Sequence, residues 1–287
     1  MATQKSEEST VAGGKANAIS TILSRLVSNI TTAKRECSMS VNPYDTAWVS
    51  MVVKPSASGT SQQWLFPRSY KFLLETQALD GSWYSEVSDL DALLSTMAAL
   101  LALLKHQRNP GITGCPPTPD LTMRISRAVS WLESKLRNFN TKACTDNVGF
   151  EILVPSLLTQ LHEYHVLFDI PQIHALTVLA DKKLASLDKL AQVLYAGHQA
   201  TALHSLEAFI GKIDFDRLRS CKVNGGMLGS PSSTAAYLMH VSEWDDEAEQ
   251  FLKDAFDFGQ GKGDGGIASA YPIEVFEMSW VSIHRVL

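Results

Sequence analysis

Apolar residues recur at helical spacing in several segments of the chain. Between residues 19 and 30 they fall three and four positions apart, and this spacing returns after Asp120, after Pro155, at residues 203–210 and after Asp245. Such spacing places apolar side chains on one face of an α-helix. No segment shows a convincing alternation of apolar and polar residues, which would indicate a strand. The pattern predicts an all-α protein.

Two glycine-rich segments, residues 77–83 and 224–235, repeat one design far apart in the sequence. Each follows one amphipathic helical pattern and precedes another, and the apolar run at 93–104 follows the first. A helix, a tight glycine turn and another helix, recurring along a chain, are typical of stacked helical hairpins.

Composition adds limits to this pattern. The 287 residues are 45% apolar and 19% charged, which allows a sizeable core. The net charge is −5 and no basic face stands out, so nucleic acid is not an expected partner. We expect a flexible leader at 1–15, a linker at 54–63 and a Pro/Gly loop at 108–120. The longest apolar run, 97–104, is too short to span a bilayer.

The cysteines and the N-terminus bear on the compartment. The first 15 residues are polar and lack the apolar region of a secretory signal. The cysteines form no C-x-x-C pair and no zinc-like spacing, so we expect free thiols, a reducing compartment and a cytoplasmic location. These cysteines are Cys37, Cys115, Cys144 and Cys221.

The C-terminal segment, residues 274–287, is apolar and helix-compatible, yet it has no Gly cap, Pro or polar tail. One interpretation is an ordinary terminal helix docked on the core. The other is a chain cut within a larger fold, which would leave an apolar face and favour self-association through this helix. The residues that would lack partners are Trp280, Val281, Ile283 and Leu287.

Seven short motifs occur in a fixed order, and together they carry a resemblance to a known family. They are Pro-Tyr-Asp-Thr-Ala-Trp (43–48), Trp-Leu-Phe-Pro (64–67), Gln-x-x-Asp-Gly-Ser-Trp (77–83), Gly-Phe-Glu-Ile-Leu-Val-Pro (149–155), Leu-His-Ser-Leu-Glu-Ala-Phe (203–209), Ser-Pro-Ser-Ser-Thr-Ala-Ala-Tyr (230–237) and Ser-Ala-Tyr-Pro (269–272). From about residue 40 onward the chain resembles the N-terminal part of fungal diterpene cyclases of the bifunctional copalyl diphosphate synthase/kaurene synthase type.

The resemblance implies a fold, a substrate and a cofactor. Residues 56–270 would form a helical-hairpin, α/α barrel-like domain called γ. Residues 1–55 would hold the leader and first helix of a second domain, β, to which the chain returns at 271–287. Geranylgeranyl diphosphate would bind between γ and β, and Mg²⁺ would be required. A third domain, α, would be absent.

The acidic motifs of that family are missing from the chain. Its protonation step uses an Asp-x-Asp-Asp acid in β, and its ionisation step uses an Asp-Asp-x-x-Asp metal motif. Neither occurs here. The stretch 245–249 fits Asp-Asp-x-x-Glu on paper, but acidic residues at a helix start favour the macrodipole and need no metal. We therefore expect no catalytic and no metal-binding residue in this chain.

A diphosphate contact is the one site function that the resemblance leaves to this chain. The family holds the diphosphate with a γ-domain lysine upstream of the Leu-His-Ser-Leu-Glu motif. Lys183 matches best, and Lys182 less well; a solvated helix surface is the alternative for both. Glu151 could serve a magnesium-responsive site but fits a helix start or a hydrogen-bonded carboxylate better, and His204 could touch substrate but fits a satisfied core residue better.

Other motif residues are interpreted as structural. We expect Asp45 to accept hydrogen bonds from backbone donors at a turn, and Tyr44 and Trp48 to pack a domain junction. Gln77 and Trp83 are expected to brace the first glycine turn.

Three interpretations of the whole chain follow. The first is an incomplete diterpene cyclase, inactive by itself. The second is a non-catalytic helical module that binds a prenyl diphosphate or a protein. The third, a prenyltransferase β subunit, ranks last because that class needs an Asp, Cys and His zinc site and the chain offers none.

Overall fold

The computed structural model describes residues 41–55, 62–85, 88–115, 118–139, 149–171, 173–259 and 264–271. All of them belong to one unit, Met39–Tyr271. A second unit combines Met1–Ser38 with Pro272–Leu287. The helices expected at 19–30 and 274–287, as well as Cys37 and Cys144, lie outside the described residues.

Helices dominate the described part of the chain, as the apolar spacing predicted. The α-helices are α2 (Pro43–Ser50), α3 (Pro67–Thr76), α4 (Asp89–Arg108), α5 (Leu121–Arg137), α6 (Phe150–Glu163), α7 (Ile173–Leu184), α8 (Leu187–Tyr195), α9 (Pro231–His240) and α10 (Asp246–Gly259). Between α8 and α9 the chain forms two 3-10 helices, η2 (Thr201–Phe209) and η3 (Phe215–Cys221).

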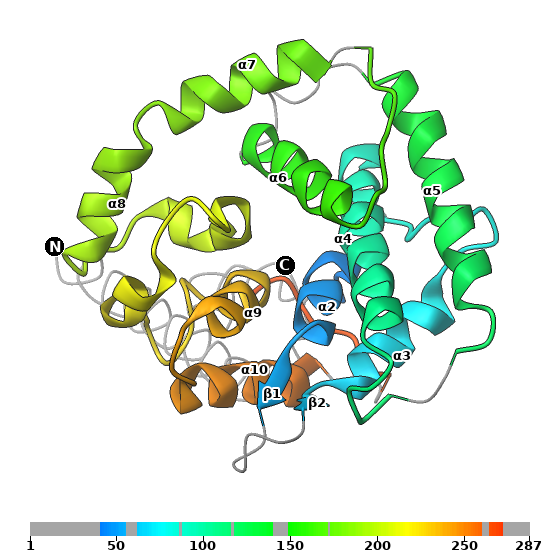
Figure 1. Ribbon diagram of the computed structural model, residues 1–287. Helices are drawn as coiled ribbons and strands as arrows, with labels where there is room; N and C mark the ends of the chain where they lie inside the picture. Colours follow the sequence, from blue (N-terminus) through cyan, green and yellow to red (C-terminus); the bar gives the residue numbers. More distant parts are fainter. Residues whose placement is uncertain are drawn as a thin grey trace, which may run out of the picture. The chain divides into compact units, whose positions relative to one another are not determined.

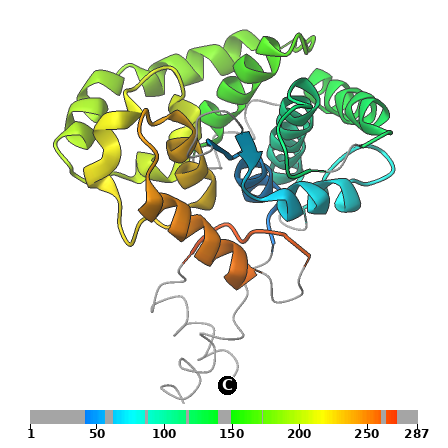
Figure 2. The same cartoon turned by 60° about the horizontal axis from the view of Figure 1, so that its bottom comes forward.

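The helices of this unit form an inner and an outer layer (Figure 1). Helix α2 packs against α3, α4 and α9, while α6 packs against α4, α7 and η2. Figures 1 and 2 show α5, α7, α8 and α10 on the outside of these inner helices. Burial agrees with the layers: α9 buries eight of its ten residues, whereas α5 buries only Ala128, Leu132 and Leu136. The alternation of inner and outer helices is the helical-hairpin architecture that the sequence predicted.

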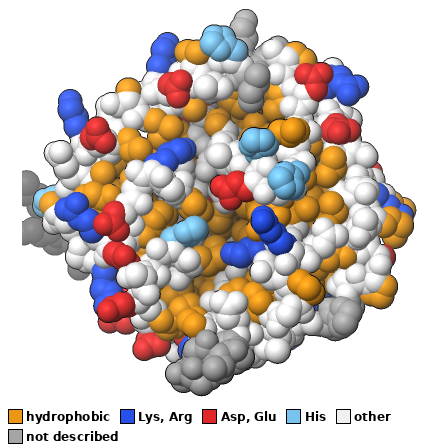
Figure 3. Space-filling view, viewed as in Figure 1, with side chains coloured by type: hydrophobic (Ala, Val, Ile, Leu, Met, Phe, Trp, Pro, Cys, Tyr) orange, Lys and Arg blue, Asp and Glu red, His pale blue; other side chains and the backbone are white. Residues whose placement is uncertain are grey.

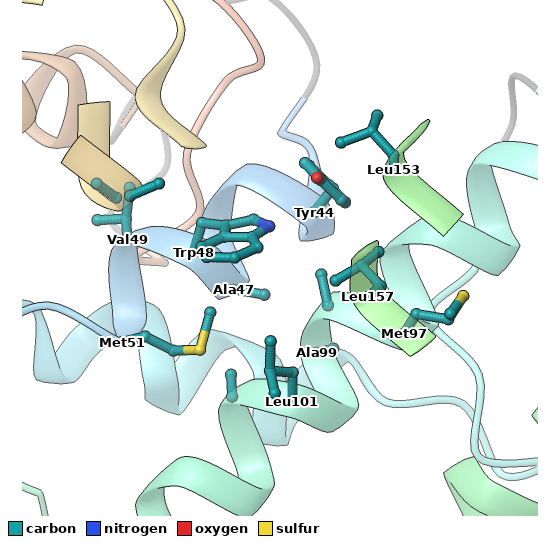
Figure 4. Packing of buried hydrophobic residues seen from close by; sticks show 14 of the residues in the cluster. Tyr44, Ala47, Trp48, Val49, Met51, Met97, Ala99, Leu101, Leu153 and Leu157 are labelled. Atoms are coloured by element: carbon teal, nitrogen blue, oxygen red, sulfur yellow. The ribbon is translucent and has the colours of Figure 1, made fainter. Parts of the chain in front are cut away.

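Helix α4 is apolar on nearly all sides because neighbours surround it. Its apolar run is buried, and it packs against α2, α5 and α6. Ser88 caps its first turn by accepting a hydrogen bond from the backbone N–H of Asp91 at 3.1 Å. Figure 4 shows one continuous apolar cluster built by α2, α4 and α6; it includes Ala47, Trp48, Met51, Met97, Leu101 and Leu157.

The expected linker at 54–63 is wrong in part, because its two ends are strands. β1 (Val53–Pro55) and β2 (Gln62–Trp64) pair antiparallel, with Val53 opposite Trp64. The Trp64 side chain is buried and stacks on His106 of α4, with ring centroids 3.7 Å apart. This packing holds β2 to the core, so the pairing does not depend on an alternating sequence pattern.

Both glycine turns sit where another part of the chain approaches closely. Gly81 has a φ of +98°, and a Cβ there would lie 2.3 Å from the backbone carbon of Arg127. Gln77 donates through Nε2 to the Gly81 carbonyl at 3.0 Å, and the Trp83 indole donates to the Leu73 carbonyl at 3.0 Å. The predicted bracing of this turn by Gln77 and Trp83 is therefore confirmed. In the second turn, Gly226 lies against the Phe251 ring.

The segment 264–271 closes the unit onto its own beginning. Asn42 donates its backbone N–H to the Ile267 carbonyl at 2.8 Å, and the Ile267 N–H donates to Thr46 Oγ1 at 2.9 Å. Val41 also pairs with Ala268 in an isolated bridge. The chain thus enters and leaves this unit at neighbouring points.

Among the described helices, none has the length and apolar character needed to cross a membrane. The described cysteines, Cys115 and Cys221, are free thiols, as expected.

Candidate functional site

The predicted diphosphate ligand, Lys183, lies in the last turn of α7. This helix belongs to the outer layer and packs against α6 (Figure 1). The neighbouring Lys182 is exposed to solvent. The side chain of Lys183 is outside the described part of the structure, so its role stays a prediction.

The structure places Glu151 as expected, but it places His204 differently. Glu151 lies in the first turn of α6, which confirms its interpretation as a helix-start residue. His204 is exposed, so the interpretation as a buried core histidine is wrong. The reason is local: residues 201–209 form a 3-10 segment with a non-helical Ser205. This geometry turns His204 outward while Leu203 and Leu206 stay buried.

A group of buried polar side chains joins three of the sequence motifs, and we call it the buried carboxyl cluster. It lies between α2, η2 and α9, with two carboxyl groups that are 3% and 2% exposed. Its members are Tyr44, Asp45, Glu207, Ser232 and Ser233.

Glu207 is the centre of the cluster. The Tyr44 hydroxyl donates to its Oε1 at 2.9 Å, and the Ser233 hydroxyl donates to its Oε2 at 2.9 Å. Ser233 also accepts the backbone N–H of Leu206 at 3.0 Å, and Ser156 of α6 donates to the Glu207 carbonyl at 3.3 Å. These bonds fix η2 against both α2 and α9.

Asp45 links the first turn of α2 to the first turn of α9. Its Oδ1 accepts the backbone N–H of Ser232 at 3.1 Å, which confirms the expected hydrogen bond from a backbone donor. The amides at the start of a helix lack intrahelical partners and favour a carboxylate or carboxyl oxygen. Trp48 is buried in the apolar cluster one turn further along α2, and Figure 4 shows its indole nitrogen on the side toward Tyr44.

Both carboxyl groups are held toward the protonated form. The pKa of Asp45 is raised to about 8, chiefly by burial and also by the nearby carboxyl of Glu207, while the Ser232 hydrogen bonds oppose the rise. Burial likewise raises the pKa of Glu207. Among the described residues no lysine or arginine forms an ion pair with either group, so no positive charge offsets the cost of burying a carboxylate here.

The cluster is built to position helices and not to meet a substrate. Its oxygens are buried and already engaged in hydrogen bonds, so they present no acid to a bound molecule. What it determines is the placement of η2, whose exposed side carries His204. Glu207 was missed from the sequence, because its partners Tyr44 and Ser233 lie in two other motifs.

The acidic stretch 245–249 lies at the start of α10, as predicted, and lysine side chains also pair with it. Asp245 accepts the backbone N–H groups of Glu247 and Ala248 and the Lys222 ammonium, which lies 2.7 Å away. Glu249 pairs with Lys54 at 2.5 Å. Within the described ranges no group of three His, Cys, Asp or Glu residues could hold a metal ion.

Charged and histidine side chains gather among apolar patches near the middle of the face shown in Figure 3. This face carries α7, α8 and η2, seen as in Figure 1.

No protein-family model matches the chain, but relatives do. It is 46% identical over 245 residues to phyllocladan-16-alpha-ol synthase of Phomopsis amygdali, which covers 85% of this chain and 24% of that protein. It is 43% identical over 242 residues to copalyl diphosphate synthase of Talaromyces verruculosus, covering 84% of this chain and 25% of that protein.

A solved structure extends the likeness to the fold. The ent-copalyl diphosphate synthase of Arabidopsis thaliana matches with a TM-score of 0.64 and 25% identity, over 88% of this chain and 34% of that one. Similarity at these levels, together with seven ordered motifs and the helical-hairpin fold, makes the chain a homologue of the fungal diterpene synthases that spans about a quarter of their length.

Proposed function

We propose that this chain is the γ domain and part of the β domain of a diterpene cyclase that converts geranylgeranyl diphosphate to a copalyl diphosphate-type product. In full-length relatives the product would go on to a diterpene hydrocarbon or alcohol. The observation that carries the proposal is the 43% identity to a copalyl diphosphate synthase over 84% of this chain. The solved Arabidopsis relative is a complex with an aza-dihydrogeranylgeranyl thiolodiphosphate, which supports a prenyl diphosphate as substrate.

The division into domains at 55 and 270 belongs to the same proposal. A domain inserted into another must begin and end at neighbouring points. The bond between Asn42 and Ile267 and the bridge between Val41 and Ala268 bring the two ends of the described unit together, which supports an inserted domain.

In this proposal the chain lines one side of the substrate site and contacts the diphosphate, but it does not supply the acid that protonates the substrate. Protonation of an alkene needs a positioned acid, and the sequence has no Asp-x-Asp-Asp. Lys183 would hold the diphosphate as a compact positive charge. Mg²⁺ belongs to the whole enzyme, and the described residues do not fit it, because the best acidic stretch is occupied by Lys222 and Lys54. We place its ligands outside this chain.

The test has two arms. The purified chain is incubated with geranylgeranyl diphosphate and Mg²⁺, and the phosphatase-treated extract is analysed for the copalyl alcohol; we expect none above the heat-killed control. A chimera in which the downstream part of the Talaromyces verruculosus enzyme follows this chain should form product. Product from the chain alone, or a folded chimera without product, would contradict the proposal.

The alternative of a non-catalytic module that binds a prenyl diphosphate or a protein makes a different prediction. Such a module would bind geranylgeranyl diphosphate without any added segment, whereas the cyclase proposal expects tight binding only in the chimera. Equilibrium dialysis of both proteins distinguishes the two.

We also propose a cytoplasmic location and self-association through residues 274–287. Light scattering should show association of the chain, and polar replacements at Val281 and Leu287 should relieve it.

A further inference from the structure

A pocket of about 360 Å³ lies away from α7 and from the buried carboxyl cluster. It is formed by the β1–β2 hairpin, the C-terminal part of α4 and the end of α9. Seven of its eleven lining residues are apolar, although polar atoms make up more of its exposed surface, and its volume lies in the range of pockets that hold small organic molecules. The residues that line it include Val53, Lys105, Met239, Val241, Ser242 and Trp244.

Lys105 brings an unneutralised charge to this wall. Its Nζ lies 3.2 Å from the Met239 sulfur, a weak acceptor, and no described carboxylate lies within ion-pairing distance of it. Burial lowers the pKa of Lys105 to about 8. Lys105 is half-buried, and a partly desolvated ammonium without an anionic partner is costly, so an anionic ligand would offset the lost hydration.

The titratable groups around Lys105 are two histidines and a second lysine, and none of them can neutralise its charge. His106, the next residue of α4, stacks between Trp64 and Tyr70, and burial lowers its pKa to about 4, so it is neutral. His240 of α9 has a pKa lowered by burial. On the hairpin side, Lys54 is already paired with Glu249. The pocket therefore combines one half-buried positive charge with several apolar side chains.

We propose that this pocket binds a small organic monocarboxylate, with its carboxylate on the Lys105 ammonium and its apolar body against Trp244, Val241 and Val53. One positive charge without an anionic partner matches one negative charge. The Ser242 hydroxyl lines the same pocket and offers a second donor. This binding is independent of the proposed cyclisation, so neither result decides the other.

The test measures the binding of 3-phenylpropionate to the 287-residue chain by isothermal titration calorimetry. The neutral 3-phenylpropanamide has the same body without the charge, and inorganic phosphate has the charge without the body. We expect the carboxylate to bind about tenfold more tightly than the amide, the effect of one charge-assisted hydrogen bond. Equal affinities of carboxylate and amide, tighter binding of phosphate, or no carboxylate binding at about 1 mM, a weak affinity for such a pocket, would overturn the proposal.

Two variants locate the site. Lys105→Met keeps the length of the side chain and suits its apolar surroundings, and it should weaken carboxylate binding about tenfold. Lys71→Met, at an exposed position of α3, should leave binding unchanged. Equal effects of the two changes would overturn the proposal.

A measurement on the unchanged protein decides the matter if Lys105→Met does not fold. A bound carboxylate favours the charged amine and raises its pKa, so binding near pH 8 should take up protons. The binding enthalpy should then differ between Tris and HEPES buffers of equal pH, and affinity should fall as the pH rises further. An enthalpy independent of the buffer would contradict the assignment to Lys105.

Discussion

The Tyr44 hydroxyl donates a 2.9 Å hydrogen bond to Glu207, a residue 163 positions further along the chain. Both groups are buried, and Ser233 of α9 donates to the other oxygen of the same carboxyl. One carboxyl group therefore ties together an early helix, a 3-10 segment and a late helix. Contacts of such large sequence separation hold the inner layer closed.

Tyr44→Phe tests the contribution of this bond to stability. It removes one donor and leaves Glu207 Oε1 buried without its partner, so the free energy of unfolding should fall by about 1–2 kcal/mol. Urea denaturation followed by circular dichroism measures the loss. Tyr84→Phe is the control because that tyrosine is 73% exposed. Equal losses in both variants would show that the bond adds nothing.

Asp45→Asn tests the raised pKa through the pH dependence of stability. The ordinary value of 3.8 rises to about 8 in the fold, so between these values the folded state keeps a proton that the unfolded state releases. The stabilisation is complete below about pH 4 and is lost as the pH rises toward 8. Asparagine keeps an acceptor for the Ser232 N–H but has no group that titrates in this pH range.

We therefore expect unfolding free energies measured at pH 5 and pH 8 to differ less in Asp45→Asn than in the parent protein. Some dependence should remain, because Glu207 also has a raised pKa. Asp257→Asn, at an exposed position of α10, should leave the dependence as it is. Identical pH profiles of Asp45→Asn and the parent would mean that Asp45 is ionised in the fold.

Gly81→Ala tests the close approach at the first glycine turn. A methyl group there would meet the Arg127 backbone at 2.3 Å and would also require a φ of +98°. We expect a loss of about 2–4 kcal/mol in unfolding free energy, from strain and overpacking together. Gly111→Ala is a matched control because nothing lies within 4 Å of its added methyl group. A Gly81→Ala protein with unchanged stability would show that the glycine turn and α5 can move apart without cost.

Lys222→Met tests the ion pair at the start of α10. Lys222 and Asp245 have side chains that are 7% and 3% exposed, and Tyr237 donates to the same carboxylate at 2.8 Å. Removing the ammonium leaves a buried carboxylate with less compensation, so stability should fall by about 2–3 kcal/mol. Lys253→Met removes a lysine that is 46% exposed and should cost less than about 1 kcal/mol. Adding Asp245→Asn to Lys222→Met should recover part of the loss.

The helices were predictable because apolar spacing encodes an exposed and a buried side. The run 93–104 became an inner helix and the spaced pattern after Asp120 an outer one, as expected for continuous and striped apolar faces. The β1–β2 hairpin was not predictable, since Trp64 and His106 stabilise it across 42 positions (106 − 64). Glu207 was missed because its partner Tyr44 lies in another motif and only folding brings them together.

The exposure of His204 shows a second limit of sequence patterns. A helical period was assumed through 203–210, but Ser205 adopts φ −142° and ψ 40° and breaks it. The Leu206 N–H donates to the Ser233 hydroxyl of α9 at 3.0 Å. A side chain from α9 thus decided the local backbone, which no single segment could reveal.

Lys183→Ala, made in the chimera with the downstream part of the Talaromyces verruculosus enzyme, tests the diphosphate contact. An ammonium held against phosphate oxygens forms a charge-assisted bond, and its loss should lower kcat/KM by an amount equivalent to about 1.5–3 kcal/mol. Lys182→Ala is the matched control, because Lys182 is exposed on the same helix and should change little. Steady-state kinetics with geranylgeranyl diphosphate compares the two. Small and equal effects would mean that Lys183 is a solvated residue of α7 and that the diphosphate is held by another part of the enzyme.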